Sequence, residues 1–100
     1  MVDVSWIRFS TWFFEDEKIK LIQTFPEADT ILIIWIRLLT MAGKINDGGA
    51  IYFSEGESYT NEMLSILLGR NEKTIEFALK IFKDYKMVSI NSEGIIFINN

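Results

Sequence analysis

One hundred residues are enough for a single domain, and a 49% share of apolar residues, including eight Phe and three Trp, can fill one core. The net charge of −4 opposes tight non-specific binding to nucleic acid, which depends on neutralising phosphates. The chain has no cysteine or histidine, so disulfides, zinc sites and the usual catalytic triads are excluded. We therefore expect a non-enzymatic domain without metal or cofactor, in a reducing cytoplasm.

The N-terminal segment, residues 5–14, is strongly aromatic and is expected to be extended or irregular, with a weak strand pattern at 6–9. The acidic residues 15–17 then predict the start of a helix over about 16–24, ended by Pro26. A solvated helix start explains these carboxylates better than a metal site, because no Asp-rich calcium loop accompanies them.

The next helix is expected to begin between Pro26 and Thr30 and to run to about Ala42, with Gly43 just past its end. Its middle, residues 31–36, is apolar on all sides, which is typical of a central helix covered on most faces. We therefore expect Trp35 to be buried. The stretch is too short for a membrane span, and its β-branched residues leave a strand as the competing prediction.

The middle of the chain predicts a turn at 44–49, a short strand at 50–53 and a loop at 54–59. Thr60 then caps a short helix over about 61–68, which ends at Gly69.

The C-terminal third predicts one more helix, over about 72–85, with Asn71 as its N-cap. Its core stripe has helical spacing and consists of Ile75, Ala78, Leu79 and Phe82. Residues 87–90 and 95–99 flank the Asn-Ser-Glu-Gly turn 91–94 and predict a β-hairpin that pairs with the 50–53 strand. Helix, tight turn, helix and hairpin together predict an α+β winged-helix domain.

In a winged helix the second helix of the helix-turn-helix enters the DNA major groove. Residues 70–86 hold five cations and three carboxylates, a net charge of +2, while the rest of the chain carries −6. The candidate DNA-binding residues are Arg70, Asn71, Lys73, Thr74, Lys80 and Lys83. Helix capping by Asn71 and ordinary solubility explain much of this pattern equally well, and Glu76 and Glu93 would repel phosphate.

Five aromatic residues between positions 6 and 14 are too many to leave in water. We expect most of these rings to pack over the domain's own core and one or two to contact a partner subunit. The candidate residues for an oligomer interface are Trp6, Phe9, Trp12 and Phe13.

Several segments in this order are familiar. They are W-I-R-F-S-T (6–11), E-D-E-K-I-K-L-I (15–22), F-P-E-A-D-T (25–30), I-W-I-R-L-L (34–39), A-G-K-I-N-D-G-G-A-I-Y (42–52), Y-T-N-E-M-L (59–64), A-L-K-I-F (78–82) and K-M-V-S-I (86–90). The chain resembles the N-terminal domain of bacteriophage replisome organisers, a DnaD-like winged-helix family. The likeness covers essentially the whole chain, and the block that begins A-G-K-I-N-D is its most specific part.

The resemblance implies a role in initiating phage DNA replication in the bacterial host, as the N-terminal part of a longer protein. Such proteins resemble adaptors that bind origin DNA or an initiator and help to recruit the host helicase loader. In the DnaD relatives this domain is largely an oligomerisation module. Three hypotheses therefore stay open: a weak DNA-binding module, a module for protein interaction and oligomerisation only, and a phage transcription regulator.

Overall fold

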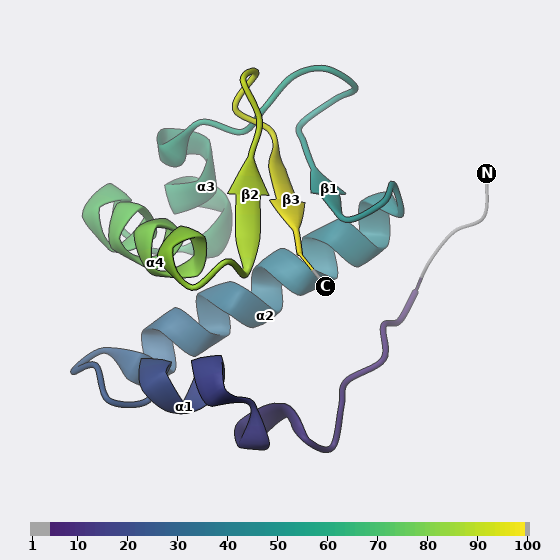
Figure 1. Cartoon of the computed structure of the whole chain (residues 1–100). Helices are drawn as coiled ribbons and strands as arrows, with labels where there is room; N and C mark the ends of the chain where they lie inside the picture. The colour runs from purple at the N-terminus through teal and green to yellow at the C-terminus, as the bar shows by residue number, and fades with distance from the viewer. Residues whose placement is uncertain (1–4, 100) are drawn as a thin grey trace.

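The computed structural model describes residues 5–99. A three-stranded antiparallel sheet and two helices, α3 and α4, stand on one side of the long helix α2, and α1 lies on the other side (Figure 1). The described part of the chain is thus built in layers around α2, which contributes Ile31, Leu32, Ile34, Trp35, Leu38 and Ala42 to the core.

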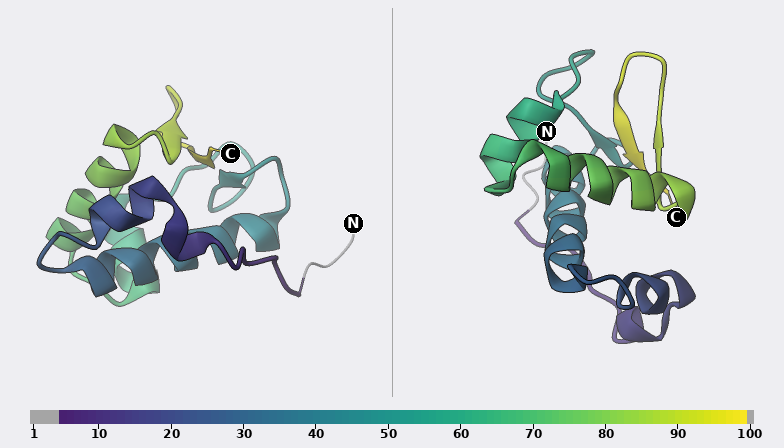
Figure 2. Two further views of the ribbon diagram at one scale, coloured as in Figure 1. Left: turned by 60° about the horizontal axis from the view of Figure 1, so that its bottom comes forward. Right: turned by 90° about the vertical axis from the view of Figure 1, so that its left-hand side faces the viewer.

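The N-terminal segment forms no strand within residues 5–12, contrary to the weak strand pattern. It runs alongside α2 and ends in a short 3-10 helix, η1 (Phe13–Glu15) (Figures 1 and 2). Helix α1 (Glu17–Ile22) is shorter than predicted. Asp16 is its N-cap, because one of its carboxylate oxygens accepts hydrogen bonds from the backbone N–H groups of Lys18 and Ile19.

Helix α2 (Ala28–Ile45) runs three residues beyond the predicted end, so Gly43 lies inside the helix. The helix ends instead at Asn46, which adopts the left-handed conformation that asparagine tolerates better than most residues. Gly43 has a packing role, because a Cβ there would overlap the Cγ2 methyl group of Ile7. The glycine therefore admits the N-terminal segment against the helix.

One stripe of α2 faces solvent, whereas the sequence predicted a helix covered on most faces. The exposed residues follow helical spacing: Asp29, Ile33, Arg37, Thr40 and Lys44. The opposite side is buried, and Trp35 there keeps only 7% of its surface exposed, as predicted. Its ring centroid lies 5.0 Å from that of Phe82 on α4.

The helix-turn-helix consists of α3 (Asn61–Leu68) and α4 (Glu72–Asp84) and agrees closely with the prediction. The Thr60 hydroxyl accepts a hydrogen bond from the N–H of Met63, and Gly69 ends α3 in the left-handed conformation. The predicted stripe of α4 is buried, so this helix is fixed on the core from one side.

The sheet has the order β1-β3-β2, with every pair antiparallel. Strands β2 (Val88–Ile90) and β3 (Ile96–Ile98) form the predicted hairpin, and β3 pairs with β1 (Ala50–Ile51), which has two residues instead of the predicted four. The hairpin projects beyond α4 as a wing (Figure 2). The α+β winged-helix prediction is therefore confirmed.

Candidate protein and nucleic-acid interfaces

The N-terminal end of α4 is stabilised by residues that were also candidates for DNA contact. The Asn71 side-chain oxygen accepts hydrogen bonds from the Thr74 N–H at 2.8 Å and from the Thr74 hydroxyl at 2.9 Å. The Arg70 guanidinium donates to the carbonyl oxygen of Gly69 at 3.1 Å, at the end of α3. These contacts give Arg70, Asn71 and Thr74 a structural role in the turn of the helix-turn-helix.

The three lysines of α4 are exposed, but they differ in what surrounds them. The Lys80 ammonium lies 2.7 Å from the Asp84 carboxylate, one helical turn away. Within residues 5–99, Lys73 and Lys83 form no ion pair. These two side chains are therefore the groups of α4 best placed to meet phosphate.

The charges on α4 itself cancel. Its three lysines are matched by three carboxylates, those of Glu72, Glu76 and Asp84. The net charge of +2 over residues 70–86 thus comes from Arg70 and Lys86, one at each end of the helix. A phosphate approaching the exposed face of α4 would meet carboxylates as well as lysines, which weakens electrostatic attraction.

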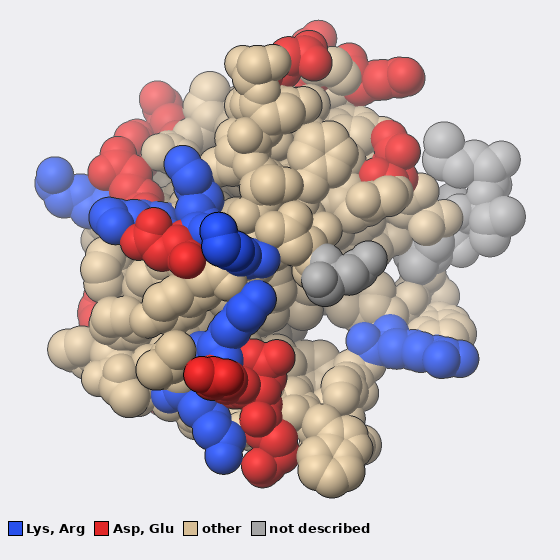
Figure 3. All heavy atoms as spheres, in the orientation of Figure 1, with Lys and Arg blue, Asp and Glu red and all other residues tan. Residues whose placement is uncertain are grey.

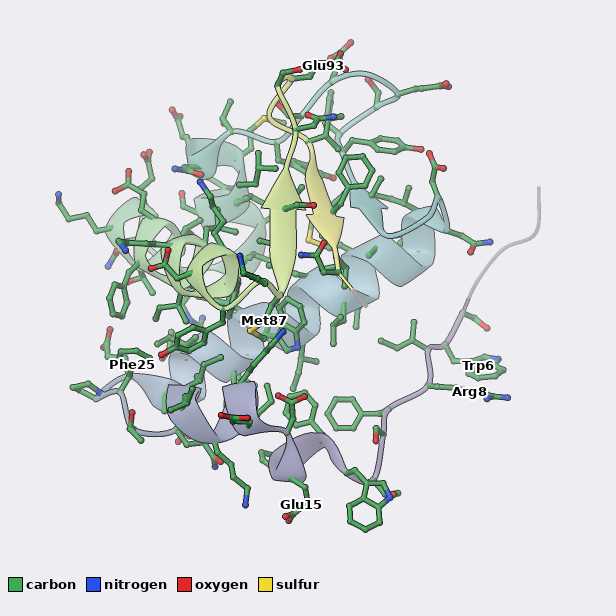
Figure 4. The ribbon with its side chains drawn as sticks, viewed as in Figure 1. Trp6, Arg8, Glu15, Phe25, Met87 and Glu93 are labelled. Atoms are coloured by element: carbon green, nitrogen blue, oxygen red, sulfur yellow. The ribbon has the colours of Figure 1, made fainter. Side chains whose placement is uncertain are left out.

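The tip of the wing is acidic. Glu93 lies at the turn between β2 and β3 (Figure 4), and carboxylates gather at this end of the molecule in Figure 3. Gly94 of the same turn lies close to Ser58, in the loop that carries Glu55 and Glu57. A wing of this charge is repelled by a DNA backbone.

Residues 5–14, which we call the arm, expose most of their aromatic surface. Trp6 and Trp12 are 72% and 73% exposed, and Phe9 and Phe14 about half exposed. Of the five rings only Phe13 packs against the core, and its centroid lies 4.6 Å from that of Phe9. The expectation that most of these rings would pack over their own domain is therefore wrong, because four of the five keep about half or more of their surface exposed.

A groove of about 530 Å³ lies between the arm, α1 and α2. Trp35, Leu39, Ile19 and Met87 form its apolar floor, and Figure 4 shows Met87 facing the space between α1 and the sheet. The arm side and rim of the groove consist of Arg8, Phe9, Ser10, Trp12, Phe13, Glu15, Asp16, Lys18 and Asn99. The groove thus collects three of the four residues predicted for an oligomer interface, and Trp6 lies outside it.

Apolar side chains on α2 and α3 were not singled out from the sequence. Ile33, Ile66 and Leu67 are all substantially exposed. The Arg37 guanidinium of α2 donates a hydrogen bond to the Leu67 carbonyl of α3 at 3.0 Å. The recurrence of Asp29, Arg37, Thr40 and Lys44 on one face of a helix would have revealed this exposed stripe.

Among the described residues no cluster of three or more carboxylate, histidine or cysteine side chains could hold a metal ion. No helix within residues 5–99 is long and apolar enough to cross a membrane. The groove is lined by aromatic, aliphatic and charged side chains.

Helix-turn-helix and hairpin packed on a central helix define the winged-helix class. Within this class, the chain belongs to the family of N-terminal phage replisome organiser domains, whose family model matches residues 6–100. No curated protein and no solved structure matches the chain. Membership of this family gives the domain a role in phage replication and an interaction with the replication machinery in general.

Proposed function

We propose that this domain is a non-catalytic assembly module of a phage replication-initiation protein, acting in the cytoplasm of the bacterial host. Copies of the chain associate through the arm, with Phe9 and Trp12 in the interface, Phe13 supporting them and Trp6 at its edge. The observation that carries the proposal is the exposure of four aromatic rings on a segment anchored to its own domain. Large exposed apolar surfaces of this kind mark interaction sites.

The exposed area is consistent with part of a dimer interface. An aromatic side chain buries roughly 150–250 Å² when it is fully covered. The exposed parts of Trp6, Phe9 and Trp12 in two copies therefore supply on the order of 700 Å². A stable interface buries about 1,200–2,000 Å² in total. The rims of the grooves would supply the remainder, through their mixed charges, since Arg8 and Lys18 of one copy can face Glu15 and Asp16 of the other.

Sedimentation equilibrium of the 100-residue chain over a range of concentrations tests this proposal. We expect a dimer or larger oligomer, and Trp12→Ala should weaken association at least tenfold, as truncation of an interfacial hot spot does. Ile66→Ala is the matched control, because Ile66 is equally exposed but lies on α3. A chain that stays monomeric at high concentration, or one in which Ile66→Ala acts as strongly as Trp12→Ala, contradicts the assignment.

A second function, weak contact with duplex DNA through α4, is favoured by the exposure of Lys73 and Lys83. In this proposal Arg70, Asn71, Thr74 and Lys80 line the same helix and add little, because their polar groups already serve the turn or an ion pair. Lys73 and Lys83 attract phosphate, but the carboxylates of α4 and of the wing repel it. We therefore expect measurable binding of duplex DNA only at low salt.

Replication proteins such as a helicase loader or an initiator are the further partners that an assembly module of this family would engage.

A further inference from the structure

The positive charge of this acidic chain is segregated in a way that the helix-turn-helix does not explain. Residues 5–14 and 30–45 hold three cations, Arg8, Arg37 and Lys44, and no carboxylate. The rest of the chain holds seven cations and fourteen carboxylates, so it carries −7 against +3 for these two segments.

The fold brings these two segments together. Ile7 packs on Gly43 and fixes the arm beside the C-terminal half of α2. On the side away from the large groove, a smaller hollow of about 210 Å³ is lined by Ser5, Trp6, Ile7, Thr40 and Lys44. Thr40 and Arg37 continue the exposed stripe of α2 from there, and the Thr40 hydroxyl donates to the Arg37 carbonyl.

We call this surface the arm–α2 face and define it by Trp6, Arg8, Arg37, Thr40 and Lys44. Trp6 and Arg8 project from the same side of the arm, away from the domain (Figure 4). The Trp6 indole is 72% exposed, so most of its surface is accessible to a ligand. The first carboxylate after Lys44, that of Asp47, accepts a hydrogen bond from the Tyr52 hydroxyl at 2.9 Å.

We propose that the arm–α2 face binds single-stranded nucleic acid, with Trp6 stacking on an unpaired base and Arg8 and Lys44 facing the phosphates. Arg37 adds positive charge to the face, but its guanidinium is held by the Leu67 carbonyl of α3. An exposed aromatic ring beside cations is the combination that binds single strands without sequence preference. A duplex hides the faces of its bases and would leave the indole without a stacking partner. Unlike α4, whose lysines are matched by carboxylates along its whole length, this stripe of α2 has its one carboxylate, Asp29, in the first turn, two helical turns before Arg37.

The large groove on the other side of the arm is unsuited to the same ligand. Trp12 there is accompanied by Glu15 and Asp16, which repel phosphate. The two sides of the arm therefore separate two tasks: self-association on the groove side, and strand binding on the arm–α2 face. Arg8 lines the large groove as well as the arm–α2 face, and Trp6 lies at the edge of the proposed self-association interface.

Titration of the 100-residue chain with a fluorescently labelled oligothymidylate tests the proposal, at protein concentrations below the onset of self-association. Trp6→Ala should weaken binding about 5- to 100-fold, the usual effect of losing one stacked base. Lys44→Gln should lower the slope of log affinity against log salt by about 0.7, one phosphate contact to a single strand. Trp6→Phe retains a ring and should restore part of the affinity lost in Trp6→Ala.

Lys20→Gln on α1 is the matched control for charge, because Lys20 is exposed and belongs to neither proposed nucleic-acid surface, and Trp12→Ala is the matched control for an exposed tryptophan. Neither variant should change oligothymidylate affinity. Trp12→Ala should still reduce the average molecular mass of the protein in solution at higher concentration, so the proposals of self-association and of strand binding are tested independently. The far-ultraviolet circular dichroism of each variant verifies that it is folded.

Three results would overturn the proposal. One is oligothymidylate affinity that is unchanged in folded Trp6→Ala and Lys44→Gln. Another is a duplex of equal length binding as tightly as the single strand. The last is polyglutamate binding with an affinity equal to that of oligothymidylate and insensitive to Trp6→Ala, which would make the face a site for an acidic protein segment.

Discussion

The Cγ2 methyl group of Ile7 occupies the space that a side chain at Gly43 would fill, and this contact joins the arm to α2. Glycine inside a helix is less favourable than alanine by about 0.8–1.0 kcal/mol, so α2 is less stable here than its sequence could make it. The missing side chain lets the arm backbone lie close to α2, and this contact fixes the positions of Trp6 and Trp12 relative to the helix.

A double-mutant cycle tests this contact. In the native chain, Gly43→Ala should be neutral or destabilising by up to about 2 kcal/mol, because overlap with Ile7 offsets the gain in helix propensity. In an Ile7→Ala background the overlap is absent, and Gly43→Ala should stabilise the fold by about 1 kcal/mol. Urea unfolding of the four proteins gives the coupling energy. Equal effects of Gly43→Ala in both backgrounds would show that the arm is not seated there.

The two tryptophans at positions 35 and 12 should differ sharply in their effect on stability. Trp35→Ala should lower the free energy of unfolding by about 3–5 kcal/mol, since the ring is buried against Phe82. A domain of roughly 5–15 kcal/mol total stability would then be marginal. Trp12→Ala should change the unfolding free energy of the monomer by less than about 0.5 kcal/mol, because Trp12 is 73% exposed. Similar unfolding midpoints for the two variants would mean that α2 is wrongly placed in the core.

The capping role of Asn71 can be separated from a role in binding DNA. Asn71→Ala should cost about 1 kcal/mol, because the Thr74 N–H loses its acceptor. Asn71→Ser preserves a capping oxygen and removes the amide, so its stability should stay within a few tenths of a kcal/mol of the native chain. If Asn71 only caps α4, Asn71→Ser will also preserve duplex affinity. Loss of duplex affinity in a fully stable Asn71→Ser would assign the amide to DNA recognition.

The lysines of α4 should contribute unequally to any binding of duplex DNA. Lys73→Gln and Lys83→Gln should each lower the log–log salt slope by about 0.9, the value for one phosphate contact on duplex DNA. Lys80→Gln should have a smaller effect, because the Lys80 ammonium is already paired with Asp84. Fluorescence anisotropy at low salt measures all three variants. The double substitution of Lys73 and Lys80 by Glu should abolish binding without unfolding the domain, since both side chains are exposed.

Equal slopes for all three glutamine variants would show that the Lys80–Asp84 pair opens at no cost when DNA binds. Absence of duplex binding even at low ionic strength would limit α4 to a structural role and leave assembly as the function of the domain.

The sequence by itself determined the helix-turn-helix and the wing. Thr60 and Asn71 are side chains that cap helices by local hydrogen bonds, and Gly69 ends α3 by its own conformational freedom. The apolar stripe of α4 and the Gly-containing turn of the hairpin are equally local. Such signals depend on residues three or four positions apart, and these elements were therefore predicted almost to the residue.

Tertiary contacts decided the parts of the chain where local signals compete. Gly43 is a typical helix-ending residue, yet it lies within α2, which ends at Asn46, and its missing side chain leaves room for Ile7, thirty-six positions earlier. Aromatic residues at 6–14 could equally cover a core or face a partner, and only the path of the arm along α2 shows which rings stay exposed. Likewise, the arm–α2 face arises from two segments that are separate in sequence, so no window of the sequence reveals that their cations share one surface.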